Sequence, residues 1–363
     1  MIARLRREEV SLIRIGCEVP VRICDVGGWI DTHFAEHGSV CNLSVYAGID
    51  GGGYQGVKAE VEARLSSKER EIRLAAPDIG LDLTEDGNGD GWDTDNLLGA
   101  TMSTITPYFP TGIDLRITAT AGCIPPGASV GTSASITTAI IAAIEYLNRG
   151  EIDADWVARS AHEVETLVMG VECGVQDQWA AAHACGAGLV DIWQYPNCRM
   201  LPIGVREDVV AALEDRLFTA IYGSAHRSSD VHKAVIEGLQ EKGRLDPRLE
   251  AFRILPAEAR HCLASGDLSG YGKVLYRNTE AQRALHQDLI SEECQRLIDL
   301  VQGFGAWGWK VNGAGGPDGG SLSVLCGGSR AKSVVIAEIR RCCPNLIILE
   351  HKLARGGIKV RVA

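Results

Sequence analysis

The residues best suited to chemistry form a loop of small side chains at positions 125–135, with the sequence PPGASVGTSAS. A strand-like run, residues 112–120, precedes this loop, and a long apolar segment, residues 136–147, follows it. Small side chains let backbone N–H groups approach an anion closely, and the start of a helix attracts negative charge. The pattern predicts a cradle for a triphosphate, although Ser and Thr residues that merely cap a buried helix would give a similar sequence.

The loop differs from the usual P-loop, G-x-x-x-x-G-K-[ST], because no Lys occurs between Lys68 and Lys233. The cation that counters the phosphates must therefore come from elsewhere. Asp177 lies in GVQDQWAAA (residues 174–182), where a Gly, a polar run and small apolar residues indicate a new helix with Asp177 in its first turn. Such an acid could take part in catalysis, but the helix dipole alone also favours one there.

The elements that would position these residues are strands and helices in alternation. Alternating polar and apolar residues at 57–63 indicate a strand with one buried face, and the predicted strands together form a mixed sheet. The predicted strands cover residues 10–15, 19–24, 39–49, 54–65, 71–75, 189–193 and 217–222. The predicted helices cover residues 96–108, 156–169, 230–239, 249–264, 268–283 and 293–303.

Two further loops could contact a ligand. DVGGWIDTH (residues 25–33) suits a loop that lines a cavity, and it would equally suit a plain β-turn. In GSAHRSS (residues 223–229), Arg227 and Ser228 at a helix start could bind an anionic part of a substrate. The alternative for this second loop is a capped, solvated turn.

Two partial metal motifs fail at a required ligand. Residues 86–91, DGNGDG, match the first half of an EF-hand loop, but its twelfth position is Leu97 instead of a bidentate Glu. We expect a flexible acidic loop there. The segment HEVET begins at His162 and has Thr166 where the zinc motif H-E-x-x-H needs its second His, which excludes that class of protease.

Composition narrows the class of partner. The 363 residues carry a net charge of −11, which argues against binding to nucleic acid or to an anionic membrane. The 12 Cys residues are scattered, and the basic start is followed by Glu8 and Glu9 instead of an apolar signal region, so we expect reduced thiols and a cytoplasmic location. No run of about 18 apolar residues is present to span a bilayer.

Three motifs together resemble those of the GHMP kinases, the family of galactokinase, homoserine kinase, mevalonate kinase and phosphomevalonate kinase. The loop at 125–135 is similar to P-x-G-x-G-L-G-S-S-A-A, with Ser129 in place of the middle Gly. PVRICDVGGWIDT (residues 20–32) resembles the first motif in its heptose-phosphate and fucose kinase form. Apart from the three motifs, GVQDQWAAA is similar to a stretch of heptose-phosphate kinases and of galactokinases. KVNGAGGPDGGS (residues 310–321) resembles K-x-x-G-A-G-G-G-G, with a departure at Pro317-Asp318 that makes phosphate contact there doubtful.

The resemblance implies a role for each matching residue. Asp177 would be the catalytic base, and Arg22 would keep its carboxylate ionised. Ser133 and Glu165 would hold Mg²⁺, and Asp31 would bind sugar hydroxyls. The nucleotide-binding residues would be Pro126, Gly127, Ala128, Ser129, Gly131, Thr132, Ser133 and Ala134. The substrate-binding residues would be Gly28, Trp29, Asp31 and Gln176. Arg227 and Ser228, which lie outside the family motifs, would bind a terminal phosphate from their helix start.

The resemblance also implies a fold and an activity. The fold would be α+β, with an N-terminal mixed-sheet domain (residues 1–210) and a C-terminal ferredoxin-like domain (residues 211–363). The activity would be ATP-dependent transfer of phosphate to the anomeric hydroxyl of a heptose 7-phosphate or a longer sugar phosphate, such as an octose 8-phosphate. A kinase of free fucose or galactose and a non-catalytic sugar sensor are the alternatives, and a homodimer is compatible with the family.

Overall fold

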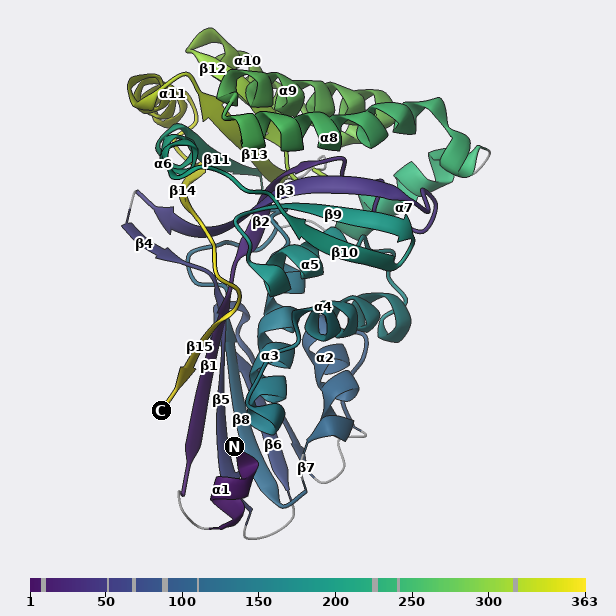
Figure 1. Cartoon of the computed structure of the whole chain (residues 1–363), viewed down its shortest axis with the longest axis vertical. Coiled ribbons are helices and arrows are strands. Elements are labelled where there is room, and N and C mark those ends of the chain that lie inside the picture. Colours follow the sequence, from purple (N-terminus) through teal and green to yellow (C-terminus); the bar gives the residue numbers. More distant parts are fainter. Residues whose placement is uncertain are drawn as a thin grey trace.

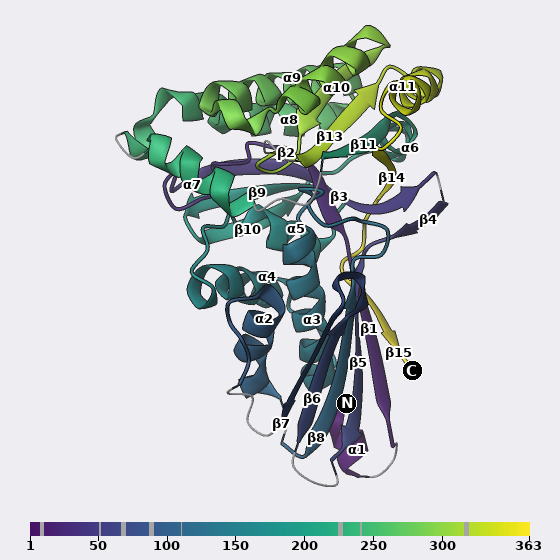
Figure 2. The same cartoon turned by 180° about the vertical axis from the view of Figure 1, so that it is seen from behind.

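The computed structural model describes residues 1–7, 11–50, 52–66, 70–86, 91–109, 111–223, 228–239, 242–315 and 319–363. Two sheets and the helices packed on them make up the fold (Figures 1 and 2). In this part of the chain, no helix is both long enough and apolar enough to cross a membrane. The helices and strands of the structure confirm the predicted α+β fold class.

The first sheet has six strands in the order β15-β1-β5-β8-β6-β7. It is mixed, as predicted, because β6 runs parallel to β8 while the other neighbours are antiparallel. The polar residues of β5 alternate with buried apolar ones, so one face of the strand packs inward. The strands are β1 (Ile13–Val19), β5 (Val57–Leu65), β6 (Glu71–Ala76), β7 (Leu81–Asp86), β8 (Ile113–Thr120) and β15 (Lys359–Val362).

The second sheet has nine strands, seven of which follow the order β10-β9-β3-β14-β11-β13-β12, while β2 and β4 also pair with β3. Its last four strands have the order expected of a ferredoxin-like unit, β14-β11-β13-β12. The strands are β2 (Val21–Val26), β3 (Gly38–Ile49), β4 (Gly52–Gln55), β9 (Ala187–Gln194), β10 (Asn197–Pro202), β11 (Leu217–Gly223), β12 (Ala306–Val311), β13 (Gly319–Cys326) and β14 (Ile347–Leu353).

The helices fall into two groups along the chain. The first group, with the short α1 (Ile2–Arg6), contains α2 (Leu97–Ile105), α3 (Thr132–Arg149), α4 (Ala154–Glu163) and α5 (Gln176–His183). The second group contains α6 (Glu207–Arg216), α7 (Ser228–Leu239), α8 (Glu250–Ser265), α9 (Leu268–Leu285), α10 (Glu292–Gly303) and α11 (Ser329–Cys342). Short 3₁₀ turns occupy Pro77–Ile79, Thr106–Tyr108, Gly243–Leu245, Pro247–Leu249 and Gln287–Leu289.

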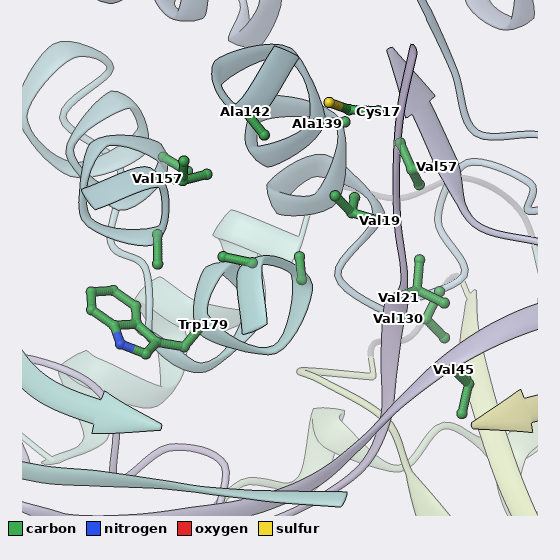
Figure 3. Close-up of a cluster of buried hydrophobic side chains, with 14 of the residues drawn as sticks. Cys17, Val19, Val21, Val45, Val57, Val130, Ala139, Ala142, Val157 and Trp179 are labelled. Atoms are coloured by element: carbon green, nitrogen blue, oxygen red, sulfur yellow. The ribbon is translucent and has the colours of Figure 1, made fainter. Parts of the chain in front are cut away.

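The main core lies between the first sheet and the first group of helices. Ala139 and Ala142 of α3, Val157 of α4 and Trp179 of α5 are buried there with Val19 at the end of β1, as Figure 3 shows. The small residues of α3 allow close packing against the sheet. The loop that precedes α3 lies beside β2, because the N–H of Arg22 donates to the carbonyl oxygen of Val130 (3.0 Å).

Two predicted helices differ in detail from the observed ones. The helix after the small-residue loop begins at Thr132, four residues before the predicted start, so Ser133 and Ala134 lie in its first turn. The helix predicted over residues 156–169 ends as an α-helix at Glu163 and continues as a π-helical turn, Val164–Val168, which carries Glu165. Residues 87–90 of the acidic loop lie outside the described part of the chain.

Candidate active site

The small-residue loop enters α3 through three residues with positive φ: Gly127 (80°), Ser129 (55°) and Gly131 (75°). Ser129 thus takes the left-handed conformation for which a Gly would be the usual choice, and the similar family motif has Gly at this position. The other predicted loop residues vary in exposure, since Pro126 is exposed and Ala128 is buried. The backbone of this loop is shaped as a tight concave turn ahead of a helix start.

The hydroxyl groups of the first turn of α3 have different roles. Ser135 donates to the carbonyl oxygen of Pro20 (2.8 Å), so its hydroxyl is used within the fold. Ser133 is exposed, and the buried Thr132 Oγ1 has no hydrogen-bond partner among the described residues. Ala134, beside them, is buried. Ser133 and Thr132 are therefore the hydroxyls that remain for a ligand.

Arg22 and Asp177 form an ion pair beside this loop. Arg22 Nε donates to Asp177 Oδ1 (2.6 Å), and Arg22 Nη2 donates to Asp177 Oδ2 (3.1 Å). Arg22 Nη1 also donates to the carbonyl oxygen of Ser129 (2.6 Å). Burial disfavours the charged guanidinium, but Asp177 and Asp25 outweigh burial and raise the pKa of Arg22. As the sequence predicted, Asp177 lies in the first turn of its helix, α5.

Asp31 holds two loops together and is 2% exposed. Its Oδ2 accepts a hydrogen bond from the backbone N–H of Gln176 (3.1 Å), and its Oδ1 accepts one from the N–H of Trp29 (3.2 Å). Burial, with a smaller contribution from Asp177, raises the pKa of Asp31 to about 6. A Cβ at Gly174 would lie 2.1 Å from Asp31 Oδ2, so only Gly fits there.

Glu165 lies close enough to Asp177 for the two carboxylates to affect each other. Gln178 Nε2 donates to Glu165 Oε1 (2.8 Å). Burial and, to a smaller extent, the charge of Asp177 raise the pKa of Glu165 to about 7. A π-helical turn such as the one that carries Glu165 is rare and often marks a functional site.

Asp25 and Lys310 were not predicted as site residues, although both lie within the motifs. Lys310 Nζ is buried and donates to Asp25 Oδ1 (3.2 Å), to Gln282 Oε1 (2.9 Å) and to the carbonyl oxygen of Val311. The N–H of Gly313 donates to Asp25 Oδ2 (3.1 Å). The pair therefore joins β2 to the start of the Gly-rich loop after β12.

The Gly-rich loop after β12 also touches the small-residue loop. Ser321 Oγ donates to the carbonyl oxygen of Ala128 (2.6 Å), and a Cβ at Gly313 would lie 3.1 Å from the carbonyl oxygen of Ser129. This segment therefore contacts the small-residue loop at Ser321 and approaches it closely at Gly313. Pro317 and Asp318 lie outside the described residues.

The remaining predicted substrate residues are only partly described. Trp29 and Gln176 are buried, and Gln176 Oε1 accepts a long hydrogen bond from Asn42 Nδ2 (3.5 Å). A Cβ at Gly28 would lie 2.8 Å from Asp25 Oδ2. Arg227 lies outside the described residues, and Ser228 is the first residue of α7, with a side chain that the structure does not describe.

Part of the chain matches a known domain family. Residues 96–185 match the GHMP kinases N terminal domain. A D-glycero-alpha-D-manno-heptose 7-phosphate kinase of Campylobacter jejuni is 24% identical over 200 residues, which are 53% of this chain and 56% of that protein. The bifunctional fucokinase/GDP-fucose pyrophosphorylase of Arabidopsis thaliana is 25% identical over 341 residues, which are 88% of this chain and 31% of that protein. The chain thus spans less than two thirds of either relative's length.

Solved structures show the same fold. A D-glycero-D-manno-heptose 1-phosphate kinase from Bacteroides thetaiotaomicron superposes with a TM-score of 0.69 at 18% identity, covering 96% of this chain and 98% of that one. The galactokinase of Lactococcus lactis complexed with galactose gives 0.68 at 14% identity, covering 96% and 95%. The comparisons lead to one conclusion: residues 96–185 match the GHMP kinases N terminal domain, and the chain shares its fold with solved sugar kinases.

Proposed function

We propose that this chain is an ATP-dependent kinase that phosphorylates the anomeric hydroxyl of a sugar, most specifically a heptose 7-phosphate or a longer sugar phosphate. The observation that carries the proposal is the ion pair between Arg22 and Asp177. On one side Arg22 contacts Ser129 of the small-residue loop. On the other side Gln176, next to Asp177, contacts Asp31 of the loop between β2 and β3 (residues 27–37), which we call the sugar loop. A phosphate donor and a hydroxyl acceptor would therefore meet at Asp177.

Asp177 would accept the proton of the attacking hydroxyl, or orient that hydroxyl, as a general base. Arg22 holds the Asp177 carboxylate through two hydrogen bonds, which fixes its direction and favours its charged form. Asp31 would accept hydrogen bonds from sugar hydroxyls, with Gly28, Trp29 and Gln176 forming the surrounding wall. This division of roles gives each carboxylate a separate task.

The residues present fit ATP and Mg²⁺. Thr132 Oγ1 is a buried hydroxyl that lacks a partner among the described residues, and the turn through Gly127, Ser129 and Gly131 leads directly to the N–H groups of α3. Mg²⁺ is usually bound by one or two carboxylates together with substrate phosphates, a role that Glu165 and the Ser133 hydroxyl could fill. When bound, Mg²⁺ would neutralise charge on the transferring phosphate.

A panel of acceptors with ATP and Mg²⁺ tests the proposal, with ADP release as the measurement. We expect turnover of heptose 7-phosphate or octose 8-phosphate to exceed that of heptose, fucose and galactose. Equal turnover of free fucose or galactose would contradict the preference for a sugar phosphate. Absence of turnover with every sugar would contradict the sugar kinase itself and favour a sensor role. The homodimer and the cytoplasmic location stay predictions.

A further inference from the structure

A cavity of about 520 Å³ opens beside the sugar loop, and none of the predicted site residues lines it. Its walls are His33, Phe34 and Glu36 on one side and, on the other, two residues of α7 and four at the following 3₁₀ turn: Ile236, Leu239, Lys242, Gly243, Arg244 and Leu245. We call it the Lys242 cavity, after the Lys in its wall. It is large enough for several non-hydrogen atoms of a ligand.

The Lys242 cavity lies next to Asp31 of the candidate active site, because residues that are close in the sequence belong to both. Only Thr32 separates the buried Asp31 from His33, which lines the cavity. Trp29 and Ile30 pack in one cluster with Val235 and Leu239, so the sugar loop and α7 share a core. Both views of the fold place α7 beside the start of β3, which directly follows the sugar loop (Figures 1 and 2). A ligand held at Asp31 would have this cavity as its neighbour.

The wall opposite α7 is fixed by ion pairs and hydrogen bonds. Arg253 donates to the carbonyl oxygens of His37 (2.6 Å), Ala35 (3.3 Å) and Arg244 (3.0 Å), and so ties the end of the sugar loop to the 3₁₀ turn. The guanidinium of Arg244 is paired with Glu36. These contacts hold the rim of the cavity in place, and the ion pair neutralises the charges of Arg244 and Glu36.

Lys242 is the charge that remains in the cavity wall. Its backbone N–H donates to the carbonyl oxygen of Leu239 (3.2 Å), but its ammonium makes no hydrogen bond or ion pair with the residues that the structure describes. Asp246, whose pKa the charge of Lys242 helps to lower, is already paired with Arg248. Phe34 and the buried Leu239 supply an apolar surface in the same cavity. An ammonium beside an apolar wall suits a ligand with a carbon chain that ends in an anion.

We propose that the Lys242 cavity takes the end of the acceptor that is distant from the reacting hydroxyl, and that Lys242 binds a phosphate monoester there. This inference rests on the proposed function and names the residue that selects a phosphorylated sugar.

The test compares Lys242→Met with Lys273→Met, which removes an exposed Lys on α9 outside the cavity. The probe is 1-deoxyheptose 7-phosphate, which lacks the hydroxyl to be phosphorylated, so calorimetry measures its binding without any reaction. We expect Lys242→Met to weaken binding by roughly 10- to 100-fold, the usual worth of a charged hydrogen bond. Lys273→Met and the conservative Lys242→Arg should bind within a few-fold of the wild-type chain.

Steady-state kinetics add a second readout. With heptose 7-phosphate, Lys242→Met should raise KM by a similar factor and leave kcat nearly unchanged, because the lost contact is the same in ground and transition states. Equal weakening of heptose and heptose 7-phosphate, or unchanged binding of the probe, would overturn the proposal. Weaker binding of the probe to Lys242→Met would support it even if no sugar were turned over, so failure of the kinase function would be seen separately.

Discussion

At the scale of single residues, the chemistry depends on carboxylates with different surroundings. Asp177 is held by a guanidinium, Asp31 by two backbone N–H groups, and Glu165 by one side-chain amide. These differences give each acid a different electrostatic environment within one site. Such pairs of acids in unlike environments are a common basis for dividing catalytic roles.

Asp177→Asn tests the catalytic assignment. Asn keeps the size of the side chain and can still accept a hydrogen bond from Arg22, but it cannot take a proton from the hydroxyl. Turnover should fall by about 10²–10⁴-fold, while ATP affinity stays within a few-fold. Steady-state kinetics and a melting curve on the same preparation measure both effects. A folded variant with near-normal turnover would leave Asp177 as a helix-start acid only.

The stability of the chain should depend on pH through Asp31 and Glu165. Their pKa values are raised to about 6 and about 7, so the folded chain binds these protons more tightly than the unfolded chain does. The resulting stabilisation is complete below about pH 4 and is lost as the pH rises through 6 and 7. Glu165→Gln, which needs no proton, should therefore unfold less readily than the wild-type chain at pH 8.

The matched measurement is chemical denaturation of both proteins at pH 5 and pH 8 without Mg²⁺ or nucleotide. We expect the variant to gain on the order of 1–2 kcal/mol relative to wild type between the two pH values, since one pKa unit corresponds to about 1.4 kcal/mol. A difference between the two proteins that does not change with pH would show that Glu165 titrates normally in the fold.

At the scale of elements, the site is assembled where β2, the loop before α3 and the loop after β12 meet. The buried pair of Lys310 and Asp25 links the first and third of these elements. Burial lowers the pKa of Lys310, and the nearby carboxylate of Asp25 opposes this shift without cancelling it. The pair thus positions the loops without needing to touch a ligand.

A double-mutant cycle tests this link. Lys310→Met alone should cost about 3–5 kcal/mol of unfolding free energy, because it leaves the Asp25 carboxylate buried without its partner. Asp25→Asn combined with Lys310→Met should recover part of that loss, with an interaction energy of about 1–3 kcal/mol. Denaturant unfolding of the four proteins gives the cycle, and strictly additive effects would mean that the two side chains act independently.

At the scale of the whole molecule, local pattern predicted the elements better than their pairing. The alternation in β5 and the small residues before α3 are local signals. The strand that the first predicted and the helix that the second predicted are both confirmed. The pairing of β15 with β1 joins residues more than 300 positions apart and leaves no local signal. β14, from beyond residue 210, pairs with β3, so one sheet runs across the predicted domain boundary, which stays a prediction.

For the site too, short local patterns predicted single residues but not their long-range partners. The motifs identified Arg22 and Asp177, because each lies at a fixed position in a short pattern. The partner of Lys310 could not be inferred, since Asp25 precedes it by 285 positions and an acid in a loop is usually solvated. The π-helical turn at Glu165 was also missed, because an extra residue in a helical turn does not change the apolar pattern enough to be seen.

The most direct test of the central claim, phosphoryl transfer to a sugar hydroxyl at Asp177, is phosphorus NMR of the products formed from ATP, Mg²⁺ and heptose 7-phosphate. We expect ADP and a new phosphate monoester in equal amounts, with the new signal coupled to the anomeric proton. Asp177→Asn should form that signal slower by about 10²–10⁴-fold. Release of ADP with inorganic phosphate alone, or a new phosphate on a hydroxyl other than the anomeric one, would contradict the account.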